Sequence, residues 1–289
     1  MNVKWLLEED FFWENNPDVL SPALDKLGIE YKKSEPVFCG QGEPEKYFDK
    51  DDCVIAYGSL DFIKAVKRRT PYYPGVFCNL DNMRCSAYYT HYYDYLFNRP
   101  ATFVPLGLFK RDPMAYSSIT GDDYIPMFIR PDDGDKKFTG FVAHYEDAME
   151  KMSRMSYGNL DDRWFIVISS DCSVCMEAEY RFFVTKGEVI TGSTYKRRPY
   201  PKGELRHEEI PEYPQEAYNL AKTIADLEWQ PDPVYSVDIV KTIGGEYSLL
   251  EINSFSSAGL YACDIEKLVL RASEIAKNEW SLAYCNGAN

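Results

Sequence analysis

The stretch VYSVDIVKTIGGEYSLLEIN, residues 234–253, constrains the fold of this chain more than any other. Apolar and polar residues alternate on either side of Gly244-Gly245, a pattern that predicts two strands joined by a tight turn. A loop of only these two glycines places the carboxylates of Asp238 and Glu251 directly opposite each other. The assumed pairs are Ile243 with Glu246, Lys241 with Ser248, and Asp238 with Glu251.

Two like charges in opposed positions destabilise a hairpin, so this pairing requires an explanation. Asn253 lies two residues beyond Glu251 and therefore projects from the same face of the sheet. A buried pair of anions needs a nearby cation, or a proton on one carboxyl group. Two carboxylates and an amide oxygen suit Mg²⁺ that keeps waters and shares phosphate oxygens with a substrate. The neighbours expected to be buried are Val237, Ile239, Leu250 and Ile252.

The alternative is a hairpin that faces solvent and whose acids are simply hydrated. A bulge in either strand would also change the assumed register and separate the two carboxylates. This stretch alone leaves both interpretations open.

The whole chain of 289 residues is long enough for one large domain or for two to three lobes with a substantial core. Its net charge of −14 argues against broad binding to nucleic-acid phosphates, although a local basic groove is compatible with it. The N-terminus has no signal-peptide pattern, and no apolar run approaches the ~20 residues of a membrane helix. We therefore expect a cytoplasmic protein without a membrane partner. Cys172 and Cys175 lack the second pair of a zinc ribbon, so we expect free thiols there.

The N-terminal part alternates between predicted strands and helices. Strands are expected at residues 3–7, from residue 29 onward and at 52–57, with helices at 18–27 and 62–69. This order indicates an open α/β lobe over roughly residues 1–75. Gly58 and Ser59 follow a strand at its carboxyl end, where such sheets bind ligands.

The rest of the chain is expected to be a mixture of helices and antiparallel strands. The turn-rich segment at residues 71–85 indicates a boundary. The later elements expected are a helix at 86–98, short strands ending at 129, a polar turn at 132–140, a helix at 144–155, a strand at 163–170, a hairpin at 177–196, and helices at 215–228 and 265–280.

Two basic motifs could bind an anion. In FIRPDDGDKKFTG, Arg130 ends a strand, and a glycine-containing turn follows with Lys136 and Lys137, a combination that suits phosphates. It is not a Walker A loop, and a plain charged turn explains it equally well. Arg181 lies between apolar and aromatic residues, so it needs an anionic partner. The simplest partner is a structural salt bridge, for instance to Glu179 or Glu251.

Taken together and in order, these motifs resemble the ATP-grasp superfamily. The matching segments are FIRPDDGDKKFTG, EYRFFVTKGEVITGS, VYSVDIV and LLEINSFSSAGLY. The chain looks most like an uncharacterised phage and bacterial clade marked by two arginines and a lysine, and the ribosomal-protein glutamate ligases are more distantly similar. The resemblance covers roughly residues 95–280, and the N-terminal lobe resembles that clade's pre-ATP-grasp domain. It implies a fold class of α/β and α+β, with a pre-ATP-grasp domain at residues 1–90 and a two-lobed ATP-grasp domain at 91–289.

The resemblance also implies residues that bind the nucleotide. Arg130 matches a position at the α- and β-phosphates where many members carry a lysine, so it departs from the usual pattern. Gly134 and Lys137 match the turn that covers the phosphates. Glu177 and Glu179 belong to the segment that matches the hinge beside adenine and ribose.

For the chemistry, the resemblance assigns Arg181 to the γ-phosphate and the acyl-phosphate intermediate. Asp238, Glu251 and Asn253 match the Mg²⁺ ligands. Lys196 is a candidate catalytic residue, because Tyr195-Lys196 stand where the glutamate ligases have an arginine pair. This departure leaves the acceptor substrate open.

The function implied is an ATP-dependent ligase that joins a carboxylate to an amine or a thiol through an acyl phosphate, with ATP and Mg²⁺. The expected substrates are small molecules or peptides, and a nucleic-acid-linked acceptor and a homodimer stay open. One alternative is a kinase or phosphotransferase on the same scaffold. Another is a non-catalytic nucleotide-binding module, against which the intact set of charged residues argues.

Overall fold

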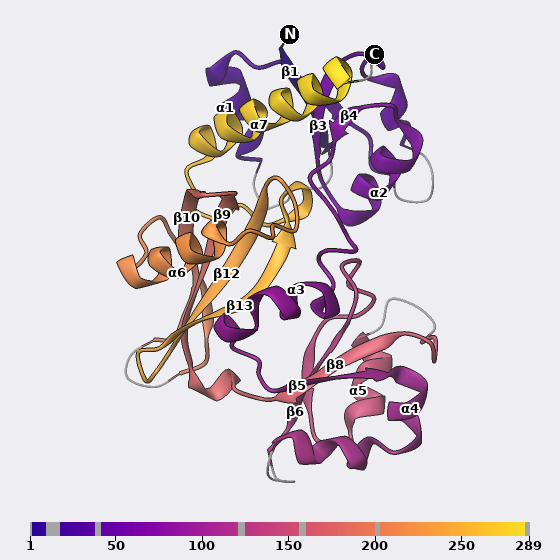
Figure 1. Cartoon of the computed structure of the whole chain (residues 1–289), viewed down its shortest axis with the longest axis vertical. Helices are drawn as coiled ribbons and strands as arrows, with labels where there is room; N and C mark the ends of the chain where they lie inside the picture. Colours follow the sequence, from indigo (N-terminus) through magenta and orange to yellow (C-terminus); the bar gives the residue numbers. More distant parts are fainter. Residues whose placement is uncertain are drawn as a thin grey trace.

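The computed structural model describes residues 2–9, 18–37, 42–120, 125–155, 160–199 and 203–286. In these segments three sheets follow one another along the long axis of the molecule, with the N-terminal sheet at the top of Figure 1. The N-terminal sheet is parallel, and the other two are antiparallel. This arrangement confirms the α/β and α+β fold class predicted from the sequence.

The N-terminal sheet has the strand order β2-β1-β3-β4. Strand β3, CVIAY, is buried along its whole length because both faces of the sheet are covered, as parallel sheets require. Helix α2 begins where β3 ends, and the Ser59 hydroxyl caps it by accepting a hydrogen bond from Phe62 N. The elements are β1 Val3–Glu8, α1 Leu20–Leu27, β2 Tyr31–Ser34, β3 Cys53–Tyr57, α2 Leu60–Arg69 and β4 Tyr73–Gly75.

The last helix, α7 (Ile265–Asn286), returns to this sheet and lies across it beside α1 in Figure 1. Its apolar face includes Leu268 and Ala272, which share one core with Trp5 and Leu24 from the start of the chain. The division of the chain into residues 1–90 and 91–289 stays a proposal, and α7 crosses it.

The small sheet, at the bottom of Figure 1, has the strand order β5-β8-β6-β7. Helices α4 and α5 and the sheet share a core built around Phe109, Ile129, Met152 and Ile168. Side chains alternate along β6, so that Ile129 is buried while Arg130 is only half-buried. The elements are β5 Ala101–Pro105, α4 Leu106–Arg111, β6 Met127–Pro131, β7 Phe141–Ala143, α5 Ala148–Met155 and β8 Phe165–Ser170.

The large sheet has the strand order β11-β10-β9-β12-β13. Helices α3 and α6 share a core with one face of its central strands, to which Phe182 and Val237 contribute. The residues that alternate with these, including Arg181 and Asp238, therefore lie on the opposite face. The elements are α3 Cys85–Tyr92, β9 Met176–Thr185, β10 Glu188–Arg197, β11 Arg206–Ile210, α6 Gln215–Asp226, β12 Tyr235–Thr242 and β13 Tyr247–Ser254.

The hairpin of β12 and β13 pairs Asp238 with Glu251, as predicted. The predicted loop length is wrong, because Thr242 N donates to Glu246 O and Gly245 adopts φ +86°, which makes a three-residue loop. The strands near the turn are therefore shifted by one residue. A bulge at Leu250 restores the register.

The bulge also corrects the burial predicted for this strand. Leu249 is fully buried in place of Leu250, and Leu250 is half-buried and lines the cavity described below. The other three neighbours expected to be buried are buried, namely Val237, Ile239 and Ile252.

Four short elements have no strong periodic signal in the sequence and were not expected, namely β4, α4, β7 and β11. Strands of three to five residues are stabilised by pairing with their neighbours, which sequence alone does not show. In the part of the chain that the structure describes, no helix is long and apolar enough to cross a membrane.

Candidate active site

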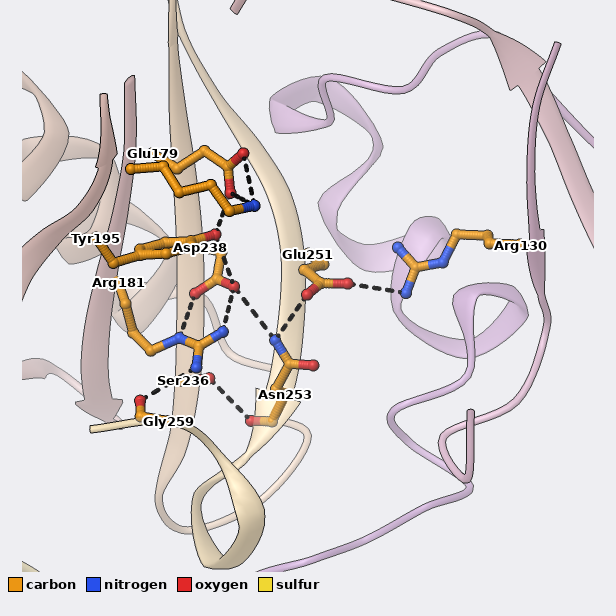
Figure 2. Close-up of polar contacts among 10 residues, drawn as sticks. Arg130, Glu179, Arg181, Tyr195, Ser236, Asp238, Glu251, Asn253 and Gly259 are labelled. Carbon is orange, nitrogen blue, oxygen red and sulfur yellow. Dashed lines mark hydrogen bonds and ion pairs between the residues drawn. The ribbon is translucent and has the colours of Figure 1, made fainter. Parts of the chain in front are cut away.

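The polar face of the large sheet gathers charged side chains from adjacent strands. The register aligns Arg181 of β9 with Asp238 of β12, which in turn aligns with Glu251 of β13. The same register places Glu179 of β9 opposite Lys196 of β10. Neighbouring strands thus bring together residues that are far apart in the sequence, as Figure 2 shows.

Arg181 and Asp238 form a two-point ion pair at the centre of this face. Arg181 Nε and Nη2 donate to the two carboxylate oxygens of Asp238 at 2.8 and 2.6 Å, and Nη1 donates to Gly259 O at 3.1 Å. The side chains are only 8% and 0% exposed. The guanidinium also lies 4.8 and 5.3 Å from the ring centroids of Tyr261 and Tyr195. The partner of Arg181 is therefore Asp238, and the expected pairing with Glu179 or Glu251 is wrong.

Glu179 forms a second acidic centre beside this pair. The Tyr195 hydroxyl donates to its carboxylate, and Lys196 Nζ lies 3.1 and 3.2 Å from its two oxygens. Burial raises the pKa of Glu179, although the charge of Lys196 and the Tyr195 hydrogen bond oppose the rise. The Tyr195 hydroxyl is also 3.4 Å from Asp238 Oδ2, which joins the two centres.

Glu251 and Asn253 extend the cluster toward the small sheet. Asn253 Nδ2 donates to Glu251 Oε1 at 3.1 Å and lies 3.4 Å from Asp238 Oδ2. Arg130, 121 residues away in the sequence, reaches across from β6 and donates to Glu251 Oε2 at 3.0 Å. Figure 2 shows Arg130 approaching Glu251 from the side opposite Arg181.

Positive charge around Glu251 keeps it ionised. Burial alone would raise the pKa of Glu251, but the charges of Lys136 and Arg130 and the Asn253 hydrogen bond outweigh burial and lower the pKa to about 2. The amide of Asn253 and the guanidinium of Arg130 thus hold a carboxylate that is a full negative charge at neutral pH.

The turn at residues 132–140 supplies further cations. Lys136 has a positive φ of 49° and is exposed at the cavity, where its charge acts on Glu251. Lys137 instead donates to Asp135 Oδ2 at 2.7 Å. Lys136 is therefore a site residue to which the sequence analysis gave no separate role. The adjacent pair of lysines was visible in the sequence, but the backbone conformation that separates their directions was not.

A cavity of about 1310 Å³ lies over this face and extends to the small sheet and to the N-terminal end of α2. Most of the residues predicted for the site line it, namely Arg130, Gly134, Lys137, Glu179, Arg181, Lys196, Glu251 and Asn253. Residues for which no role was predicted also line it, among them Tyr261 and Lys64, and so does Ser59 from the predicted ligand-binding edge of the N-terminal sheet.

Two predicted site residues do not line the cavity. Asp238 is fully buried beneath Arg181. Glu177 forms an ion pair with Lys241 at 2.8 Å. The nucleotide-binding role expected for Glu177 stays a prediction.

The donor set fits a hard cation such as Mg²⁺ in part. Glu251 and Asn253 present oxygen atoms beside the cavity, and Mg²⁺ takes few protein ligands when it shares phosphate oxygens with a substrate. Both carboxylates already have arginine partners, so Arg130 would have to release Glu251 first. Among the described residues, no group of three or more His, Cys, Asp or Glu side chains could hold a metal ion.

Comparison with known proteins gives a family and a fold. The family model that matches residues 95–272 describes an ATP-grasp domain, family 3 of the clade named for two arginines and a lysine. No curated protein shows significant sequence similarity to the chain.

Solved structures match over nearly the whole chain. The D-cycloserine synthetase DcsG has a TM-score of 0.59 at 14% identity, with 95% of this chain and 100% of that chain covered. D-alanyl-alanine synthetase A from Vibrio cholerae O1 biovar eltor str. N16961 has a TM-score of 0.56 at 12% identity, with 96% and 98% covered. The ATP-grasp ligase PsnB, complexed with a phosphomimetic variant of its minimal precursor, Mg and ADP, has a TM-score of 0.53 at 14% identity, with 96% and 99% covered. At these identities the likeness shows the fold alone.

Proposed function

Because the chain belongs to family 3 of the ATP-grasp clade with two arginines and a lysine, we propose that it is an ATP-dependent ligase that joins a carboxylate to an amine or a thiol through an acyl phosphate. The observation that carries the proposal is the cluster of Arg181, Asp238, Glu251 and Asn253, which Arg130 reaches across a large cavity. Preorganised charges of this kind stabilise a transferring phosphoryl group.

The nucleotide would lie between the small and the large sheet. Arg130, Lys136 and Lys137 line that part of the cavity and supply positive charge for the phosphates. Cys172 and Met176 line the cavity where β8 leads into β9, which is where the resemblance expects the adenine. Free thiols at Cys172 and Cys175 stay a prediction, which metal analysis showing about one zinc per chain would contradict.

Mg²⁺ would be held by Glu251, Asn253 and Asp238 together with the phosphates, and it would neutralise charge on the transferring group. This chain's own contribution is to hold the reacting groups in place and to keep Glu251 ionised. Arg181 is fixed by Asp238 and Gly259 O and still faces the cavity, so its remaining N–H groups can bind the transferring phosphoryl group.

The reaction would run in two balanced steps. A carboxylate oxygen of the acid substrate bonds to the γ-phosphorus of ATP, and the bond to ADP breaks. The amine or thiol then attacks the acyl carbon, loses a proton, and displaces inorganic phosphate. No enzyme nucleophile is needed in either step.

The size of the cavity supports two substrates beside ATP. Its volume of about 1310 Å³ exceeds the roughly 300–1,000 Å³ of ordinary small-molecule pockets. The similar PsnB structure holds a precursor variant, and the D-alanyl-alanine synthetase is named for a small product, so small and peptide substrates are both consistent with this fold.

The kinase or phosphotransferase alternative uses the same phosphate-binding residues, and product analysis separates the two. The protein is incubated with ATP, Mg²⁺ and pools of acids and amines, and ADP, phosphate and new masses are measured. A ligase releases phosphate in equal amounts with a joined product, and this release should disappear in a folded Arg181→Ala variant. A phosphorylated product without free phosphate would establish the kinase, and no ATP turnover with any pool would contradict both.

A further inference from the structure

The turn at residues 132–140 is held from outside its own sheet. The carboxylate of Asp132 accepts a hydrogen bond from the backbone N–H of Ser86 at 2.8 Å. Gly134 packs on Leu80 so closely that an added Cβ would lie 2.4 Å from Leu80 O. The first half of the turn is therefore fixed by the segment that leads from β4 into α3.

The tip of the turn is tied to the N-terminal sheet through a single ion pair. Lys64, on α2, donates to Asp135 Oδ1 at 2.8 Å, and the two side chains are 29% and 18% exposed. Lys64 also contacts Asp61 in its own helix at 2.7 Å. Asp135 thus receives one cation from α2 and another, Lys137, from the turn itself.

This attachment decides where the cations of the turn lie. Asp135 immediately precedes Lys136, whose positive φ directs its charge toward Glu251. A shift of Asp135 would move both lysines of the turn relative to the cavity. The position of α2 is in turn fixed by the end of β3 and its Ser59 cap.

From this geometry we propose that Lys64 is a positioning residue, which latches the turn at residues 132–140 over the cavity through Asp135. The N-terminal sheet and its helices thereby set how readily nucleotide phosphates reach the lysines of the turn. The latch itself rests only on the contacts above, and its effect on the nucleotide rests on the proposed function.

Hydrogen–deuterium exchange of the turn, measured without nucleotide, tests the latch directly. Amide exchange reports local opening, so the peptide covering residues 132–140 should exchange about fivefold faster in Lys64→Ala, the size expected for loss of one partly exposed ion pair. Asp135→Ala should exchange at least as fast. Lys64→Arg should restore protection, and Arg68→Ala, which removes an exposed cation from the same helix, should match the wild-type protein.

The double variant shows whether Lys64 acts through Asp135. If it does, adding Lys64→Ala to Asp135→Ala should not accelerate exchange further. Lys64→Met serves as a second variant that keeps the aliphatic stem, in case Lys64→Ala alters packing. Wild-type exchange in both Lys64→Ala and Lys64→Met, or a further fivefold acceleration in the double variant, would overturn the proposal.

Steady-state kinetics then test the consequence for the nucleotide. Lys64→Ala and Asp135→Ala should raise the KM for ATP about three- to fivefold at nearly unchanged kcat, because they alter phosphate entry and not the transfer itself. An unchanged KM in a variant whose turn exchanges faster would refute the effect on the nucleotide. Failure of the proposed function would instead leave no ATP turnover in the wild-type protein, while the exchange result would stand.

Discussion

Two ion pairs in this site join an arginine to an acid, and they differ in almost every other respect. Arg181 and Asp238 are cross-strand neighbours in one sheet, make two contacts, and are 8% and 0% exposed. Arg130 and Glu251 come from different sheets, make one contact, and are 15% and 24% exposed. The first pair is part of the folded sheet, whereas the second bridges two sheets and can be exchanged for a ligand.

The difference indicates a division of roles. A buried pair with two contacts keeps its geometry whether or not a ligand is bound, so Arg181 is suited to act on the transition state. Arg130 can leave Glu251 when ATP phosphates arrive, and Glu251 then becomes available to Mg²⁺. Binding of ATP and Mg²⁺ should therefore reinforce each other.

The largest effect is expected for Arg181→Ala. Asp238 would be left buried and unpaired, which should lower the free energy of unfolding by about 3–5 kcal/mol. Turnover should fall by a factor on the order of 10²–10³, as for other donors that stabilise developing charge, while the affinity for ATP changes little. Denaturant unfolding and phosphate release measure the two effects.

The control for Arg181→Ala adds Asp238→Asn to it. The second change removes the unpaired charge, so it should recover part of the lost stability but none of the turnover. A folded Arg181→Ala protein that turns over at the wild-type rate would show that Arg181 is only a structural residue.

A smaller effect, of a different kind, is expected for Arg130→Ala. The KM for ATP should rise about tenfold with a smaller loss of kcat, because Arg130 binds phosphates already present in the ground state. Stability should fall by about 1 kcal/mol or less, since the pair with Glu251 is partly exposed. If Arg130→Ala destabilises the protein as much as Arg181→Ala, the contrast between the two pairs is wrong.

The smallest effects are expected for the two lysines of the turn at residues 132–140. Lys136→Ala should raise the KM for ATP about fivefold, whereas Lys137→Ala should raise it only about twofold, because Asp135 already neutralises Lys137. ATP titration of initial rates compares the two variants. A larger effect of Lys137→Ala would mean that Lys137 leaves Asp135 when ATP binds, and it would favour the assignment made from the resemblance.

The pairing of Asp238 with Glu251 was predictable because the alternation of β12 and β13 limits the possible registers. The prediction nevertheless rested on a wrong loop length, and the bulge at Leu250 compensated for the error. Turn conformation and bulges depend on single backbone angles, such as the positive φ of Gly245, which composition does not fix.

Contacts between distant segments could not be predicted from local patterns. The partner of Arg181 depends on how β9 aligns with β12, and the contact between Arg130 and Glu251 depends on how two sheets face each other. The resemblance named most of these residues as parts of one site, but it paired none of them. The bond from Lys64 to the turn had no sequence signal.

The most direct test of the account is the binding of ATP with and without Mg²⁺, measured by calorimetry and by thermal unfolding. We predict that ATP binds about tenfold or more tightly with Mg²⁺ than with EDTA, and that Glu251→Gln removes most of this difference. At a hundredfold excess of ligand over its Kd, binding should add about 2.7 kcal/mol to the stability of the folded protein. Equal ATP affinities and melting temperatures with Mg²⁺ and with EDTA would contradict the account.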